Sequence, residues 1–393
     1  MGAERTTSRL LYLGRSANVV SLAFVRNSRA NSMTKRICYI HVGPHKTGTS
    51  SIQWFLSENR AELLEHGYFV PESGANHGAQ HALARKLCGQ ELRNHQQSEA
   101  ANFARALDAT PSEAVIVSAE ALEGLLRNRD YAKAFFTRIR ELNLEPKLVL
   151  FPRNQSQQIN SLYSSVVRRF RQSEPFEAFV QGVTQRSDFR WSPLIELADA
   201  HDAELIAQPF TGKTITHGVV PEFLQVIGLD PSQFRDTNIR RNEGAGPFTV
   251  SVARSVLRLI GGTGNKLKWL QAVRCRTKLA AYLEENSLAD AGYCGLTTAL
   301  ARQIESELRP DNDVFAQCVW GRPWAEIFAV DIGEEFMPND FEMCQPDEST
   351  EHRLQQAIRE MTVIAEQVMD DPALAVEAPW NDLHRRGGWT SKA

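Results

Sequence analysis

A glycine-bearing turn between an apolar run and an amphipathic segment constrains the fold of this chain more than any other feature. Residues 36–42 are β-branched and aromatic enough to predict a buried strand, and the turn that follows contains Gly43 and Gly48. Apolar residues then recur at the spacing of one helix face, at Ile52, Phe55, Leu56 and Leu63. In a strand, turn and helix of this kind, free backbone N–H groups converge at the positive end of the helix dipole. The sequence therefore predicts a site for a phosphate or sulfate.

The position of the lysine in this turn indicates which nucleotide the site takes. Gly43 and Gly48 have the spacing of a Walker A loop, but Thr49 stands where that loop has its lysine. The lysine is instead Lys46, two residues before the second glycine. The order Lys-Thr-Gly-Thr-Ser that begins at Lys46 resembles the 5′-phosphosulfate loop of sulfotransferases that use 3′-phosphoadenosine 5′-phosphosulfate (PAPS).

A second motif makes the resemblance specific. Sulfotransferases of this kind hold the 3′-phosphate of PAPS with an arginine at the end of a later strand and a serine eight residues on, in the next helix. Here residues 147–151 predict the strand, Arg153 follows it, and Ser161 lies eight residues further. An arginine fork binds phosphate bidentately, and a serine hydroxyl adds a donor. Because parallel sheets bind ligands at the carboxyl ends of their strands, we expect both motifs at one edge of a sheet.

The resemblance, to bacterial carbohydrate-type sulfotransferases, implies a P-loop-like α/β fold: a central, mostly parallel sheet flanked by helices, with a mainly helical C-terminal part. It implies transfer of a sulfuryl group from PAPS to a hydroxyl of a carbohydrate or glycolipid, which releases adenosine 3′,5′-bisphosphate and needs no metal. The loop residues expected to bind the nucleotide together with Arg153 and Ser161 are His45, Lys46, Thr47, Gly48, Thr49, Ser50 and Ser51.

The transfer places two chemical demands on the site. Charge develops on the bridging oxygen of the leaving nucleotide, and we expect the ammonium of Lys46 to stabilise it. The acceptor hydroxyl needs a base, for which Glu120, just past the strand predicted at residues 112–118, is the first candidate. Glu120 would otherwise complement the dipole of the following helix. The rival bases are His77 and His81, spaced by four, and His45 beside the loop.

Composition excludes several other function classes. The net charge of −3 argues against wholesale nucleic-acid binding, and no run approaches the roughly 18 apolar residues of a membrane span. The 6 cysteines are scattered without a C-x-x-C pair, which indicates a reducing compartment and no zinc site. These features favour a cytoplasmic enzyme. A basic helix end at Arg168, Arg169 and Arg171 is the local patch that would suit an acidic polysaccharide.

The predicted elements divide the chain into three parts. Residues 1–35 are expected to be a disordered or mis-called extension, since Met33 directly precedes the first strand; their basic, hydroxyl-rich composition would alternatively fit a transit peptide. Residues 36–240 are expected to form the PAPS-binding core. Residues 241–393 are expected to be helical and to pack on the core, because strand patterns fade there.

Two other functions remain open from the sequence. A P-loop kinase would need a Walker lysine and an aspartate for magnesium, neither of which the sequence places convincingly. A non-catalytic nucleotide-binding protein would keep the fold, and could keep Arg153, but would lose Lys46 or the base; Lys46 is present, which favours an enzyme. The acceptor and the oligomeric state are not predicted.

Overall fold

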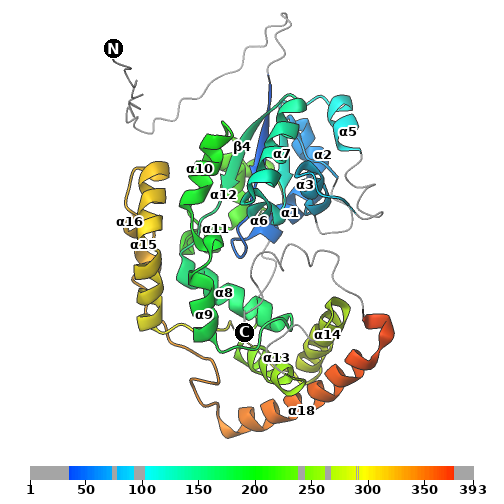
Figure 1. Ribbon diagram of the computed structural model, residues 1–393, viewed down its shortest axis with the longest axis vertical. Coiled ribbons are helices and arrows are strands. Elements are labelled where there is room, and N and C mark those ends of the chain that lie inside the picture. The colour runs from blue at the N-terminus through cyan, green and yellow to red at the C-terminus, as the bar shows by residue number, and fades with distance from the viewer. Residues whose placement is uncertain are drawn as a thin grey trace, which may run out of the picture. The chain divides into compact units, whose positions relative to one another are not determined.

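The computed structural model describes residues 35–72, 78–92, 102–237, 244–261, 267–288, 290 and 292–375 (Figure 1). The internal contacts of the chain separate residues 1–34 from a second unit that begins at Lys35. Residues 1–34 of the predicted extension and the candidate base His77 lie outside the described residues.

The second unit is built on a five-stranded sheet in which every neighbouring pair is parallel, in the order β2-β3-β1-β4-β5. The strands are β1 (Arg36–His41), β2 (Tyr68–Phe69), β3 (Ala114–Ser118), β4 (Leu144–Leu150) and β5 (Glu204–Ala207). His41 pairs with Ser118 on one side and Val149 on the other, so the three central strands end at nearly the same level. The chain leaves β1 toward β2 and leaves β4 toward β5, which puts the switch point, where such sheets bind ligands, between β1 and β4.

The strands form because both faces of the sheet are buried. Along β1, Cys38 and Ile40 face one apolar cluster, and Tyr39 faces another on the opposite side. The same alternation holds in β3, where all residues from Ala114 to Ser118 are buried. Continuous apolar strands of this kind are typical of parallel sheets covered by helices on both faces. The α/β class predicted from the sequence is therefore confirmed.

Helices cover each face of the sheet. Those that follow the first three strands or flank β5 are α1 (Thr49–Glu58), α2 (Arg60–Glu65), α3 (His81–Leu87), α5 (Phe103–Ala109), α6 (Ala121–Leu126), α7 (Arg129–Glu141), α10 (Ser192–Ala200), α11 (Gly212–His217) and α12 (Val219–Val226). Helices α1 and α12 bury Phe55 and Phe223 against the Tyr39 face. Helices α3, α6, α7 and α10 cover the Cys38 face.

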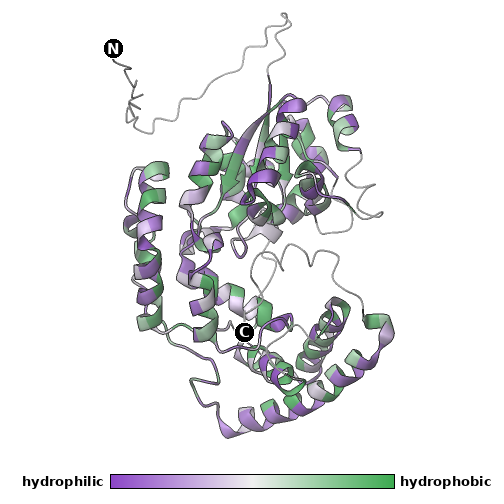
Figure 2. Cartoon of the chain, viewed as in Figure 1, coloured by the Kyte–Doolittle hydropathy of each residue, from purple (hydrophilic) through white to green (hydrophobic). Residues whose placement is uncertain are grey.

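After Gly244 the described residues contain helices and no strand. A third apolar cluster joins this region to two earlier helices, α8 (Gln155–Arg168) and α9 (Phe176–Thr184). Its later members lie on α13 (Pro247–Leu259), α14 (Trp269–Glu285), α15 (Thr298–Trp320) and α18 (Glu348–Asp370); the short α16 (Trp324–Ile327) and α17 (Ala329–Ile332) follow α15. Figure 2 shows hydrophilic and hydrophobic residues interleaved along α15 and α18, as in helices that bury one side. Helix α8 therefore belongs both to the sheet edge and to the helical region.

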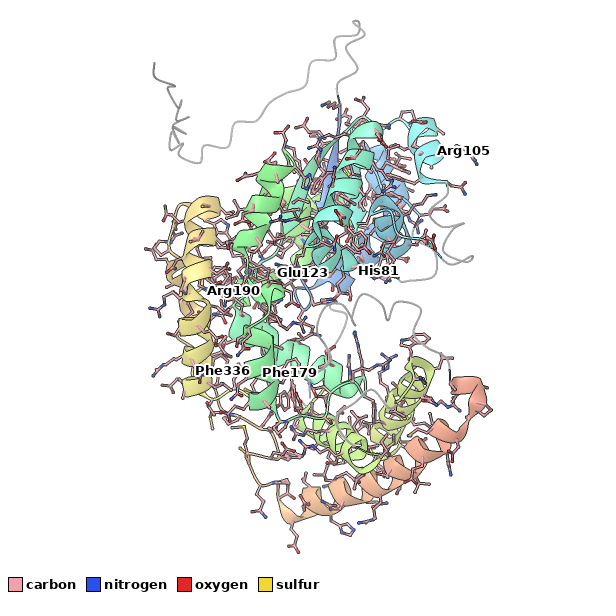
Figure 3. All side chains as sticks on the ribbon, in the orientation of Figure 1. His81, Arg105, Glu123, Phe179, Arg190 and Phe336 are labelled. Atoms are coloured by element: carbon pink, nitrogen blue, oxygen red, sulfur yellow. The ribbon has the colours of Figure 1, made fainter. Side chains whose placement is uncertain are left out.

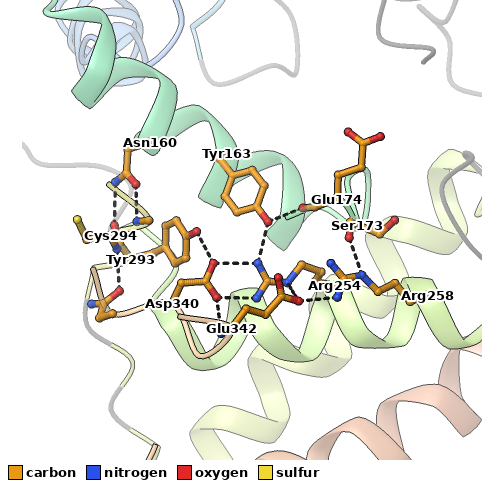
Figure 4. Close-up of polar contacts among 12 residues, drawn as sticks. Asn160, Tyr163, Ser173, Glu174, Arg254, Arg258, Tyr293, Cys294, Asp340 and Glu342 are labelled. Carbon is orange, nitrogen blue, oxygen red and sulfur yellow. Dashed lines mark hydrogen bonds and ion pairs between the residues drawn. The ribbon is translucent and has the colours of Figure 1, made fainter. Parts of the chain in front are cut away.

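A buried ion pair ties α8 to the helical region (Figure 4). The Arg254 guanidinium on α13 donates to both carboxylate oxygens of Asp340, at 2.6 and 2.9 Å, and Arg254 is 1% exposed. The same guanidinium donates to the hydroxyl of Tyr163 on α8 at 2.9 Å, and the Tyr293 hydroxyl donates to Asp340 at 2.6 Å. Every charge in the pair is thus met by a partner, as burial requires.

Replacing Asp340 with Asn is expected to lower the free energy of unfolding by about 3 kcal/mol, because it removes the buried carboxylate of Arg254 and leaves only Glu342, 3.0 Å from its Nε, to balance the charge. Urea denaturation followed by circular dichroism measures the change. The matched control is Glu326→Gln, which breaks an exposed i,i+4 pair with Arg322 and should cost no more than about 0.5 kcal/mol. Equal stability of the two variants would contradict a stabilising role for the buried pair.

Candidate functional site

The loop between β1 and α1 has the backbone conformation of an anion-binding nest. Lys46 has φ 72° and Gly48 has φ 76°, with Thr47 between them. Alternation of left-handed and right-handed residues turns successive N–H groups toward one point. A lysine rarely adopts positive φ, and such strain is found mostly at binding and catalytic sites.

The carbonyls of this loop are bound by side chains, which holds the peptide planes in place. Three successive carbonyl oxygens, from residues 44 to 46, accept hydrogen bonds from threonine, glutamine and arginine side chains. Thr47 and Thr49 donate to Pro44, Gln158 donates to His45, and Arg153 donates to Lys46, at 2.8, 3.1, 3.0 and 2.9 Å respectively. Two of these donors, Gln158 and Arg153, lie more than 100 residues away in sequence.

The N–H groups of the loop are left available. The amides of Ser51 and Ile52 bond to the Gly48 carbonyl at 2.9 and 3.3 Å and so begin the hydrogen bonding of α1. In the part of the chain that the structure describes, four preceding amides form no backbone hydrogen bond: those of Thr47, Gly48, Thr49 and Ser50. Together with the dipole of the ten-residue helix α1, they can bind an anion.

Lys46 adds a cation to these amides. Its side chain is half-buried, and within the described residues its ammonium forms no hydrogen bond or ion pair. Burial, together with the neighbouring charges of Arg169 and Arg168, lowers the pKa of Lys46 to about 8, against the opposing effect of the Glu120 carboxylate. A strained, half-buried lysine among other cations is stabilised when an anion binds beside it.

Arg153 lies on the other side of the switch point, just after β4. Its Nη1 donates to the Lys46 carbonyl, and its guanidinium carbon lies 5.4 Å from the centre of the Phe210 ring. Its buried Nε atom has no hydrogen-bond partner among the described residues. Burial lowers the pKa of Arg153 to about 10, opposed by Asp331 and Glu334. One face of the guanidinium is thus packed, and one donor is left for a ligand.

Ser161 lies on α8, which begins two residues after Arg153. It follows Gln158 by three positions, and residues three apart share one face of a helix. Because the Gln158 side chain contacts the loop carbonyl of His45, Ser161 lies on the face of α8 that turns toward the loop. From the start of α8 to Ser161 the helix rises about 9 Å.

The candidate bases lie on the β3 side of the loop. Nδ1 of His45 bonds to the carboxylate of Glu120, which follows β3. Burial would raise the pKa of Glu120, but the charge and hydrogen bond of His45, then His81 and Arg169, lower it to about 2. Burial would lower the pKa of His45, but Glu120 raises it. The structure therefore brings Glu120, His45 and His81 together. Figure 3 labels His81 on α3 and Glu123 on α6.

Three buried polar residues beneath the loop join the ends of β1 and β3. Nδ1 of His41 lies 2.8 Å from the Ser118 hydroxyl, and the Ser118 N–H donates to the Gln80 side chain at 2.6 Å. Burial lowers the pKa of His41 to about 4, so its ring is neutral near neutral pH. These residues and Gln158 were not among the sequence candidates, since no short motif marks them.

Across the sheet, the site has a consistent order: Glu120 after β3, Lys46 after β1 and Arg153 after β4. This arrangement defines an α/β protein in which two neighbouring strand ends, after β1 and β4, carry a cation with donors that are unbonded within the described residues. Comparison of the chain with protein-family models, curated proteins and solved structures found no match. Among the described residues, no helix is both long and apolar enough to cross a membrane, no group of three metal-ligating side chains occurs, and the six cysteines are unpaired.

Replacing Gly48 with Ala is expected to lower the free energy of unfolding by about 1–3 kcal/mol, because the new side chain must keep positive φ. Its Cβ would also lie 2.6 Å from Cγ1 of Val219, at the start of α12. Thermal unfolding measures the loss. Gly212→Ala, at the first position of α11 with no atom near the added Cβ, is the control and should be neutral or slightly stabilising. A Gly48 variant as stable as this control would contradict the described loop geometry.

Proposed function

We propose that this protein is a PAPS-dependent sulfotransferase of the P-loop-like fold, acting on a hydroxyl group of a carbohydrate or glycolipid. The observation that supports this best is the hydrogen bond from Arg153 to the Lys46 carbonyl. It joins two anion-binding groups, on neighbouring strands β1 and β4, into one site at the switch point. A nucleotide with phosphates on both its 5′ and 3′ positions has the two anions that such a site needs.

The described residues include hydrogen-bond donors suited to both anionic groups of this nucleotide. The four free amides and the hydroxyl of the exposed Ser50 would hold the 5′-phosphosulfate, while the unpartnered Nε of Arg153 and the hydroxyl of Ser161 would hold the 3′-phosphate. Bound there, the nucleotide supplies an activated sulfuryl group. The charges of Arg168 and Arg169, which act on Lys46, add to the attraction for an anionic ligand.

In this proposal Lys46 stabilises the transition state. A compact ammonium held by the loop neutralises the oxygen that leaves with the nucleotide. Its lowered pKa results from burial among cations and rises again when an anion binds. On the other side of the loop, the His45–Glu120 pair supplies the group that removes the acceptor's proton. We propose that the protein acts in the cytoplasm, because its scattered cysteines fit a reducing compartment.

Calorimetric titration with adenosine 3′,5′-bisphosphate tests the nucleotide site, with AMP and ATP–magnesium as comparisons. We expect tighter binding of the bisphosphate than of AMP, and a loss of about 1.5–3 kcal/mol of that binding in Arg153→Ala. The loss for AMP should be smaller, since AMP has no 3′-phosphate. Arg322, which is exposed and follows α15, is the control, and Arg322→Ala should bind normally. A preference for ATP–magnesium would favour a kinase and overturn the proposal.

Replacing Lys46 with Ala is expected to slow turnover by about 100- to 1,000-fold, the usual effect of removing one transition-state donor. Binding of adenosine 3′,5′-bisphosphate should fall much less, because the loop amides remain. Release of the bisphosphate from PAPS, with water as the acceptor, measures turnover without knowledge of the natural acceptor. Lys213→Ala, at an exposed position on α11, is the matched control. Unchanged turnover in Lys46→Ala would exclude its role at the leaving group.

A further inference from the structure

His45 is fixed at two points, by groups that follow two different strands. Its ring Nδ1 bonds to Glu120 after β3, and its carbonyl accepts from Gln158 on α8. The ring nevertheless remains accessible, with 47% of the side chain exposed. Within the described residues its second nitrogen, Nε2, has no hydrogen-bond partner. The ring is therefore oriented by Glu120, and its second nitrogen is left without a partner on a half-exposed side chain.

The partner of Nδ1 decides which nitrogen is basic. An ionised carboxylate only accepts hydrogen bonds, so Glu120 requires the proton of a neutral His45 ring to be on Nδ1. The lone pair then lies on Nε2, which has no partner among the described residues. A carboxylate that orients an imidazole in this way is the arrangement that makes histidine an effective base.

Glu120 itself is poorly suited to take a proton. The interactions with His45, His81 and Arg169 hold the pKa of Glu120 at about 2, far below the pH at which a base works best. Glu120 and His45 are therefore not equally suited to act as the base.

We propose that His45 is the catalytic base of this site and that Glu120 is its positioning residue, an inference that rests on the sulfotransferase function proposed above. As Nε2 of His45 takes the acceptor's proton, the acceptor oxygen forms its bond to sulfur. The bond from sulfur to the bridging phosphate oxygen breaks, and its electron pair stays on that oxygen beside Lys46. No other reactant is required.

The order of the residues across the sheet agrees with these roles. In-line displacement needs the base and the leaving group on opposite sides of the sulfur. Glu120 orients the His45 ring toward the β3 side, whereas Arg153 binds the backbone carbonyl of Lys46 from the β4 side. The acceptor would thus approach from the β3 side, and the nucleotide would extend toward Arg153.

The charges around His45 determine its pH dependence. Glu120 after β3 and Glu123 on α6 raise its pKa, Arg169 at the end of α8 lowers it, and the ring acts in turn on His81 of α3. The free base exists above this pKa, so turnover should rise as the pH rises through it. Removing the charge of Glu120 should move that rise to lower pH.

Two measurements on the full-length protein test the assignment. In spectra of protein with ¹⁵N-labelled histidine, the signal lost in His45→Asn should titrate above the ordinary histidine pKa and show a proton on Nδ1. In Glu120→Gln the same signal should titrate at lower pH. A His45 signal that Glu120→Gln leaves unmoved, or a neutral ring protonated on Nε2, would overturn the dyad.

Turnover of PAPS, with water as acceptor, gives the second measurement. His45→Asn should slow it by about 100-fold or more while adenosine 3′,5′-bisphosphate still binds, and His352→Asn, exposed on α18, should have no effect. His45→Gln, with normal thermal unfolding, repeats the test should the Asn variant fold poorly. Full activity in both His45 variants with loss in Glu120→Gln would make Glu120 the base. Failure of the wild type to bind the bisphosphate would instead refute the sulfotransferase proposal, leaving the spectra as the test of the pair.

Discussion

The hydrogen bond from Arg153 to the Lys46 carbonyl holds the geometry on which the site depends. Hydrogen bonds to charged groups contribute about 1.5–3 kcal/mol. Lys46 in the left-handed region costs about 1–3 kcal/mol. The two terms are of the same size, so the contact offsets the strain that turns the loop amides outward. The strand end after β4 therefore helps to shape the loop after β1, and neither anion-binding group is independent of the other.

Helix α8 extends this dependence to the rest of the chain. Near its start, Gln155 and Asn312 of α15 exchange amide hydrogen bonds at 2.5 and 3.0 Å. Further along, Tyr163 bonds to the buried Arg254 on α13, which Asp340 neutralises. Gln158, which binds the loop carbonyl of His45, lies between these two attachments. The helical region after Gly244 thus fixes the position of a helix that supports the loop.

The sequence predicts the parts of this arrangement that depend on neighbouring residues. The turn at Gly48 and the strand before Arg153 can be predicted because apolar periodicity and glycine position are properties of a few neighbouring residues. β4 begins at Leu144, earlier than the predicted residue 147. The prediction misses these residues because a proline such as Pro146 is unusual inside a strand. β5 starts to pair only at Lys147, so Pro146 has a strand on one side only and is tolerated.

The contacts that give the site its chemistry lie beyond such local patterns. His45 and Glu120 are 75 residues apart, and His45 and Gln158 are 113 apart, so only the order of the strands brings them together. The sequence predicts Glu120 as the base, but the pKa of a carboxylate depends on the charges that lie near it in space. With His45 and His81 nearby, Glu120 stays ionised and orients the His45 ring. The basic atom of the pair is then Nε2 of His45. The chemical role of Glu120 thus follows from the parallel pairing of β1 with β3, which sets the carboxyl ends of these two strands side by side.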